Sequence, residues 1–211
     1  MTESKRDFDA KAATWDDDPK KTERAVAVAQ GIRANAPLSP TMTGFEYGCG
    51  TGLLSIALQP YLKHITLADS SSGMLAVLRE KIAVAGIANL SPVLLDLVTD
   101  PLPAERYKLI YTLMTFHHIE DIDKMLGACY ALLDPPGYLC VADLDSEDGT
   151  FHGPEFTGHK GFDRADLGRR AARAGFGKVA FTSVFQMKKG KGPGQTEFPI
   201  FLMVAEKSGP T

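Results

Sequence analysis

Short apolar runs alternate with longer segments of helical periodicity along most of this chain. The runs are bounded by turn residues and have the length of buried strands. They predict strands at residues 44–47, 65–69, 93–95, 109–113 and 138–144. Helices are expected to fill the gaps, because a mostly parallel sheet needs helices on both of its faces.

Start and stop signals support three of these helices. The helix at residues 74–85 should close at Gly86, which suits a left-handed C-terminal cap. A helix from residue 122 to 133 should be stopped by the prolines that follow it. A third begins with Asp163 as its N-cap and ends near Gly175.

The pattern changes near the C-terminus. Residues 179–187 and 198–205 are strand-like and are joined by a short loop of glycine and lysine, which favours antiparallel neighbours. The expected fold is therefore an α/β fold with a seven-stranded, mostly parallel sheet. Its last strand is antiparallel and is expected at the sheet edge.

Composition limits the possible functions. With 211 residues and 44% hydrophobic content, the chain can bury one substantial core. A net charge of −3 argues against a nucleic-acid surface, and the one basic cluster, residues 188–191, is interpreted as a solvated hairpin tip. No apolar run reaches the roughly 18 residues that a membrane span needs. Three cysteines without a C-x-x-C pair fit a reducing compartment, so a cytoplasmic location is expected.

The most informative segment follows the first predicted strand. Gly48, Gly50 and Gly52 stand at alternate positions behind Glu46, with Cys49 between the first two glycines. Glycine permits a turn in which a ligand lies against the main chain. A dinucleotide fingerprint, G-x-G-x-x-G, would place its last glycine where leucine stands here. A carboxylate at the strand end would repel a pyrophosphate but suits an ammonium group.

This segment resembles the first motif of the class I S-adenosylmethionine-dependent methyltransferases, an acidic residue followed by G-x-G-x-G. The resemblance extends over about residues 45–144. Asp69, seventeen positions after Gly52, ends the second predicted strand at an offset that suits a ribose contact. Asp96 ends the third, where the family places an acceptor for the adenine amine.

The resemblance implies one cofactor, S-adenosylmethionine, and a set of residues around it. Met74 would pack near the adenine, and the segment after the fourth strand would lie beside the methionine part. The implied cofactor-binding residues are Glu46, Gly48, Cys49, Gly50, Gly52, Asp69, Ser70, Met74, Asp96, Leu97, Leu113, Met114 and Trp15.

The N-terminal segment is expected to form two helices, broken at Pro19, as a helical cap over residues 1–40. Residues 41–211 would form the Rossmann-like domain, with one compact domain overall. Phe8, Ala12 and Trp15 share one helical face. Two interpretations stay open: a packing face, or the lid that small-molecule members of the family fold over the cofactor, with aromatic rings against the sulfonium.

Catalytic residues are unknown from the sequence, and His117, His118 and His159 are the candidates. The first two open a helix beside the expected methyl site, where they act as bases or simply line the pocket. No metal is expected, because the acidic residues 143–148 follow no ligand spacing.

The resemblance implies methyl transfer to a small-molecule acceptor by in-line displacement, in which positioning supplies most of the rate. A non-catalytic S-adenosylmethionine-binding protein and a nicotinamide-dependent oxidoreductase are the alternatives. The expected partner is a small-molecule substrate, without nucleic acid or membrane, in a monomer or homodimer. The acceptor atom does not follow from these residues.

Overall fold

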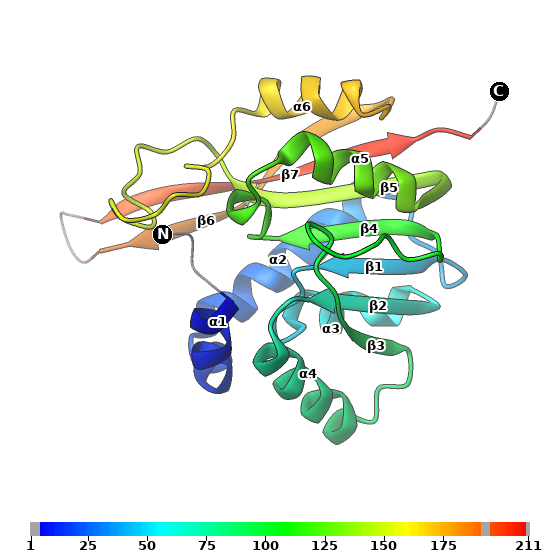
Figure 1. The fold of residues 1–211 in the computed structure, drawn as a ribbon, viewed down its shortest axis with the longest axis horizontal. Coiled ribbons are helices and arrows are strands. Elements are labelled where there is room, and N and C mark those ends of the chain that lie inside the picture. The colour runs from blue at the N-terminus through cyan, green and yellow to red at the C-terminus, as the bar shows by residue number, and fades with distance from the viewer. Residues whose placement is uncertain (1–4, 191–194, 210–211) are drawn as a thin grey trace.

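One sheet organises the computed structural model, which describes residues 5–190 and 195–209 (Figure 1). Within these residues the sheet has seven strands in the order β3-β2-β1-β4-β5-β7-β6. The strands are β1 (Thr43–Tyr47), β2 (His64–Asp69), β3 (Leu90–Leu94), β4 (Tyr107–Leu113), β5 (Leu133–Leu144), β6 (Val179–Lys189) and β7 (Thr196–Lys207). The predicted α/β fold with an antiparallel last strand is confirmed.

The position of the reversed strand differs from the prediction. β7 pairs antiparallel with both β5 and β6, so it lies inside the sheet and β6 forms the edge. The expectation of a reversed strand at the edge is wrong. Burial gives the physical reason: residues 198–205 are almost continuously buried and need cover on both sides, whereas β6 alternates with exposed positions that suit an edge.

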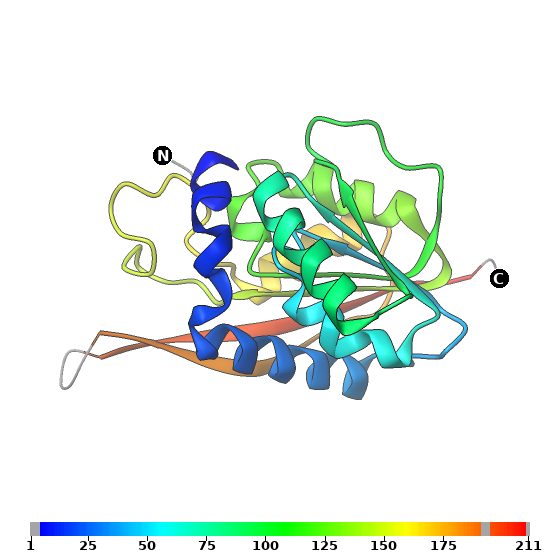
Figure 2. The same ribbon diagram turned by 90° about the horizontal axis from the view of Figure 1, so that it is seen from below.

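Helices cover both faces of the sheet. They are α1 (Lys5–Lys11), α2 (Pro19–Asn35), α3 (Leu53–Leu58), α4 (Ser72–Ala85), α5 (Ile122–Leu132) and α6 (Arg164–Arg173), with short 3₁₀ helices η1 (Ala12–Asp17), η2 (Gln59–Tyr61) and η3 (Phe116–His118). One buried cluster joins α2, α3 and α4 to the sheet, and a second joins α5 and α6 to the opposite face (Figure 2).

The predicted helix ends are close to the observed ones. Ser71 caps α4 by accepting from the Met74 amide at 3.1 Å, and Gly86 closes the helix at φ +64°. Asp163 caps α6 by accepting from the Asp166 amide at 2.7 Å. Pro19 is the first residue of α2, where its missing N–H costs nothing.

The prediction that helices fill every gap is wrong between β3 and β4. Residues 95–106 connect these strands without a helix. Pro101 and Pro103 remove two amide donors from the segment, and this prevents a continuous helix there. In the part of the chain that is described, no helix has both the length and the apolar character needed to cross a bilayer.

The strand order creates one crevice for a ligand. β1 pairs in parallel with β2 on one side and β4 on the other, so the chain order reverses at β1. In open α/β sheets ligands bind beyond the carboxyl ends of the strands at such a point. α1 and the segment of residues 146–162 lie at this end of the sheet (Figure 1).

Candidate functional site

The glycine turn after β1 depends on glycine at each alternate position. Gly48, Gly50 and Gly52 have φ of +69°, +52° and +79°, in the region that L side chains rarely adopt. A Cβ on Gly48 would lie 2.4 Å from Thr115 Cγ2, and one on Gly52 would lie 2.4 Å from Leu78 Cδ1. The turn is therefore both left-handed and closely packed.

Asp69 at the end of β2 holds this turn in place. Its Oδ2 accepts a hydrogen bond from the Gly50 amide at 2.7 Å, and its Oδ1 accepts one from the Ser71 amide at 2.8 Å. Burial raises the pKa of Asp69, while these amide donors act against the rise. The structure thus brings the predicted ribose-binding carboxylate to the predicted glycine turn.

Glu46 lies beneath the turn in the core. Its side chain is buried, and it accepts a hydrogen bond from the Ser55 hydroxyl, which is 2.6 Å from the Tyr111 hydroxyl. Burial raises the pKa of Glu46 to about 8, so the carboxyl group holds a proton at neutral pH. Its predicted contact with an ammonium group would require ionisation of this carboxyl group.

The other predicted cofactor residues surround the same end of the sheet. Asp96 Oδ1 accepts from the Tyr47 hydroxyl at 3.1 Å and from the Val98 amide at 2.9 Å. Met74 and Leu97 are buried, whereas Ser70, Leu113 and Met114 are half-buried. Met114 directly follows β4 with φ of +56°, an uncommon conformation for this residue type.

The N-terminal aromatic residues reach this site. Trp15 Nε1 lies 3.9 Å from where a Cβ on Gly50 would stand. The Phe8 ring is 6.0 Å from the Trp15 ring and 5.6 Å from the His118 ring, both in edge contacts. Among Phe8, Ala12 and Trp15, which were predicted to share one helical face, only Ala12 is fully buried.

Two carboxylates that the sequence analysis missed fasten this segment to the sheet. Asp9 accepts from the Ser71 hydroxyl at 2.6 Å and from the Gly73 amide at 2.7 Å. Asp16 accepts from the Thr51 hydroxyl at 2.6 Å and pairs with Lys81 at 2.7 Å. No spacing signal links residues so far apart in the chain, so only the fold could reveal these contacts.

Histidines gather at the carboxyl ends of β4 and β5. His117 Nδ1 is 2.6 Å from Asp143 Oδ1, and both side chains are fully buried. Burial alone would raise the pKa of Asp143, but His117 and two backbone amides lower it overall. Asp143 is therefore an ionised acceptor, and it keeps the proton of His117 on Nδ1.

His118 and His152 complete a group that we call the histidine cluster, together with His117. Their ring centroids lie 4.1 to 5.5 Å apart. Burial, with the adjacent His117 and His152, lowers the pKa of His118 to about 3. His117 Nε2 and His118 Nδ1 are buried and lack hydrogen-bond partners within the described residues. Each such atom costs about 1–3 kcal/mol unless a ligand satisfies it.

The third candidate, His159, does not join this cluster. Its Nε2 is 3.3 Å from the Glu120 carbonyl, and its ring lies against Phe162. The acidic segment near it is occupied by local donors: Asp145 pairs with Arg164 at 2.6 Å, and Glu147 accepts from two backbone amides. The fold therefore brings histidine side chains together at this site, and not these carboxylates.

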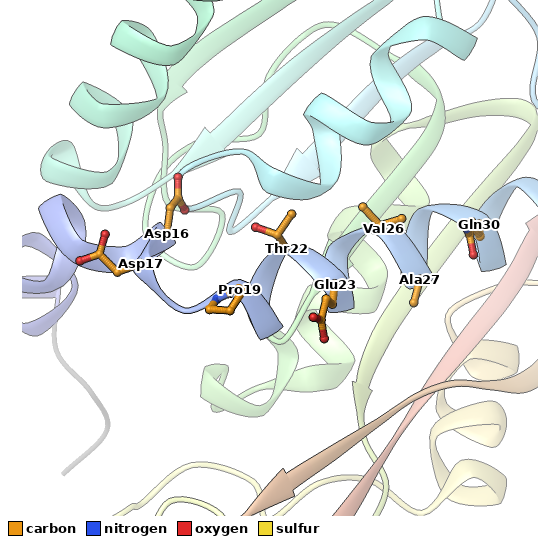
Figure 3. A pocket seen from close by; sticks show the side chains of 8 residues that line it. All are labelled: Asp16, Asp17, Pro19, Thr22, Glu23, Val26, Ala27 and Gln30. Atoms are coloured by element: carbon orange, nitrogen blue, oxygen red, sulfur yellow. The ribbon is translucent and has the colours of Figure 1, made fainter.

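A hollow of about 640 Å³ lies on the outer side of η1 and α2. Figure 3 shows that its lining side chains come from this one stretch of chain, including Asp17, Glu23 and Val26. Neither the histidine cluster nor any of the predicted cofactor residues lines it. We therefore assign the functional site to the strand ends rather than to this hollow.

The fold and the site define a Rossmann-like α/β domain with its ligand crevice at the switch point beside β1. Residues 45–137 match the family model described as a methyltransferase domain. The match covers the segment that carries the glycine motif, so the assignment of this segment as similar to methyltransferases, drawn from that motif, is confirmed.

The similar proteins agree with this assignment. An uncharacterized methyltransferase from Schizosaccharomyces pombe is 34% identical over 53% of this chain and 42% of its own length. The chain spans about half the length of the curated relatives that it matches.

Two solved structures show the shared fold. A chain in the complex between the Haloferax volcanii Trm112 methyltransferase activator and a methyltransferase has a TM-score of 0.74 at 18% identity, with 96% of this chain and 98% of that chain covered. A phosphoethanolamine N-methyltransferase from Haemonchus contortus, solved with phosphomonomethylethanolamine and S-adenosylhomocysteine, has a TM-score of 0.70 at 15% identity, with 86% and 52% covered.

Proposed function

We propose that this protein transfers the methyl group of S-adenosylmethionine to a small-molecule acceptor. The observation that carries the proposal is the contact of Asp69 with the Gly50 amide across two strands. It joins a left-handed glycine turn to a carboxylate that can accept from a ribose. Leucine at position 53, in place of a third dinucleotide glycine, supports an adenosyl ligand over a nicotinamide cofactor.

In this proposal the side of the crevice with the glycine turn binds the cofactor, and the side with the histidine cluster receives the acceptor. The glycine turn and Asp69 hold the nucleoside, and Asp96 accepts from the adenine amine near Met74 and Leu97. Ser70 would lie at the ribose end, and Leu113 and Met114 beside the methionine part. Trp15 covers the sulfonium, whose cation favours an aromatic face.

The acceptor would enter from the side of the histidine cluster. Methyl transfer requires nucleophile, methyl carbon and sulfur in line at about 3 to 3.5 Å, with water excluded. Phe8 bridges Trp15 and His118, so the N-terminal segment can cover both ligands together. A base is needed only for an acceptor that arrives protonated.

Two measurements test the proposal. Trp15 is the only tryptophan, so its fluorescence should change on titration with S-adenosylmethionine or S-adenosylhomocysteine and not with NAD. The protein is then incubated with methyl-labelled S-adenosylmethionine and a pool of small metabolites, and labelled product is sought by mass spectrometry. A response to NAD alone would refute the proposal. Tight adenosyl binding without any labelled product would indicate a binding protein.

A further inference from the structure

The histidine cluster has a ligand geometry that the proposed methyl transfer does not require. One ring nitrogen from each of its three residues lies within 4.8 Å of the others. We propose that the histidine cluster binds a divalent transition-metal ion of the zinc type, through one nitrogen from each of His117, His118 and His152. Metal binding can be measured without any substrate, so this inference stands apart from the proposed function.

The first ligand is oriented as in known histidine metal sites. Asp143 accepts the Nδ1 proton of His117, so Nε2 is the nitrogen left to present a lone pair to an ion. The Nε2 atom is buried and without a partner among the described residues. A carboxylate behind a ligating histidine fixes its tautomer and makes the ring a better donor.

The second ligand offers a lone pair for the same reason. His118 Nδ1 is also buried without a hydrogen-bond partner in the described part of the chain, and its ring is 4.1 Å from that of His117. Two lone pairs cannot hydrogen-bond to each other, so neither nitrogen can satisfy the other. A cation between them would satisfy both nitrogens at once.

The geometry requires little movement to close around an ion. Zinc–nitrogen bonds of about 2.0–2.1 Å place tetrahedral ligands about 3.3 Å apart. The rings come from η3 and from the segment after β5, so rotation of the side chains can bring 4.8 Å down to that value. Three protein ligands would leave a fourth position open to water or to an acceptor atom.

The ligand set also selects the kind of metal. Calcium and magnesium prefer oxygen ligands, whereas imidazole suits zinc, cobalt, nickel and copper. Asp143 favours positive charge on His118 whereas Lys11 opposes it, and Arg24 lies near enough to act on Asp143. The charges around the cluster are therefore mixed, and the imidazole lone pairs are what favour zinc-type ions.

The test is a metal titration of the full chain after removal of bound metal with a chelator. Calorimetry with zinc chloride should give one site per chain, and cobalt should give the visible absorption of a tetrahedral complex. His118→Ala and His152→Ala should each lose saturable binding. His64→Ala is the matched control, because His64 begins β2 outside the cluster, and it should bind like the wild type.

Asp143→Asn adds a second readout, with an expected loss of roughly 10–100-fold in zinc affinity while the ligands remain. Circular dichroism checks that each variant is folded. If Asp143→Asn unfolds, the two alanine variants decide the question, because His118 and His152 are only half-buried. No saturable zinc binding by the wild type, or equal losses in His64→Ala and His118→Ala, would overturn the proposal.

Discussion

The two halves of the crevice are built by different means. The glycine half, Gly48–Gly52 with Asp69, consists of backbone amides and a carboxylate held at fixed positions by a tightly packed turn. The histidine half consists of side chains from η3, β5 and the segment after it, with buried nitrogens left unsatisfied among the described residues.

The glycine half is therefore suited to one fixed ligand, whereas the histidine half can adapt to different ligands. Backbone amides can bind a ligand only in a conformation that few sequences allow, so a sequence motif reveals such a binding site. A group of imidazoles can rotate to suit a cation or an acceptor, and many sequences can supply it. We therefore expect substitutions in the glycine half to damage the fold and cofactor binding together, whereas those in the histidine half should change one ligand alone.

The largest effect is expected for Gly52→Ala. The new Cβ would be strained at φ +79° and would overlap Leu78, so the free energy of unfolding should fall by about 2–5 kcal/mol. Gly86→Ala is the control: it has φ +64° but no neighbour within 4 Å, so it should lose only about 1–2 kcal/mol. Urea denaturation measures both. Equal losses would show that the turn is less tightly packed than its geometry indicates.

The next largest effect is expected in the pH dependence of stability, which should be opposite for Glu46, beneath the glycine half, and Asp143, in the histidine half. The pKa of Glu46 is raised from 4.5 to about 8, so the unfolded chain releases a proton that the folded chain keeps. Its stabilising effect, present below the ordinary pKa, is lost as pH rises toward 8. Relative to Glu46→Gln, the wild type should lose up to about 1.4 kcal/mol per pH unit in this window. Parallel urea-denaturation profiles for the two proteins would contradict the assigned burial of this carboxyl group.

Asp143 works in the other direction, because its pKa is lowered below 3.8. Its contribution is present above that value and is lost as the pH falls. The loss of stability at low pH should therefore remain in Glu46→Gln.

Asp69→Asn should separate the ligands of the two halves. Loss of the charged acceptor should weaken S-adenosylmethionine binding by about 1–3 kcal/mol in calorimetry. Zinc affinity should stay unchanged, because Asp69 contacts the glycine turn and not the histidine cluster. His118→Ala should show the reverse pattern. If either variant lost both S-adenosylmethionine and zinc binding, the two halves would form one cooperative site and the distinction between them would be wrong.

The smallest effect concerns the N-terminal segment that spans both halves. Asp16→Ala removes the acceptor of the Thr51 hydroxyl and a partly exposed ion pair with Lys81, together worth about 0.5–1 kcal/mol. Cofactor dissociation in stopped flow should become about two- to fivefold faster. Asp123→Ala removes exposed ion pairs between α5 and α6 and should leave this rate unchanged. Equal rates for Asp16→Ala and the wild type would mean that the contacts of Asp16 do not hold the N-terminal segment over the cofactor.

The positions of most strands along the chain and most helix ends could be predicted because each depends on neighbours in the sequence. The caps at Ser71, Gly86 and Asp163 are local signals, and so is the glycine turn. The position of β7 in the sheet could not be predicted from the hairpin alone, because the hairpin does not specify which of its two strands pairs with the open edge of β5.

By itself the sequence determined the glycine motif, the acidic strand ends and the parallel core, since all three follow from residues a few positions apart. Only the tertiary structure decided that Asp143 orients His117, that His152 replaces His159 beside it, and that Asp9 and Asp16 fasten the N-terminal segment. These contacts join residues 26 to 65 positions apart, and no periodicity or spacing specifies which distant side chains a folded chain brings together.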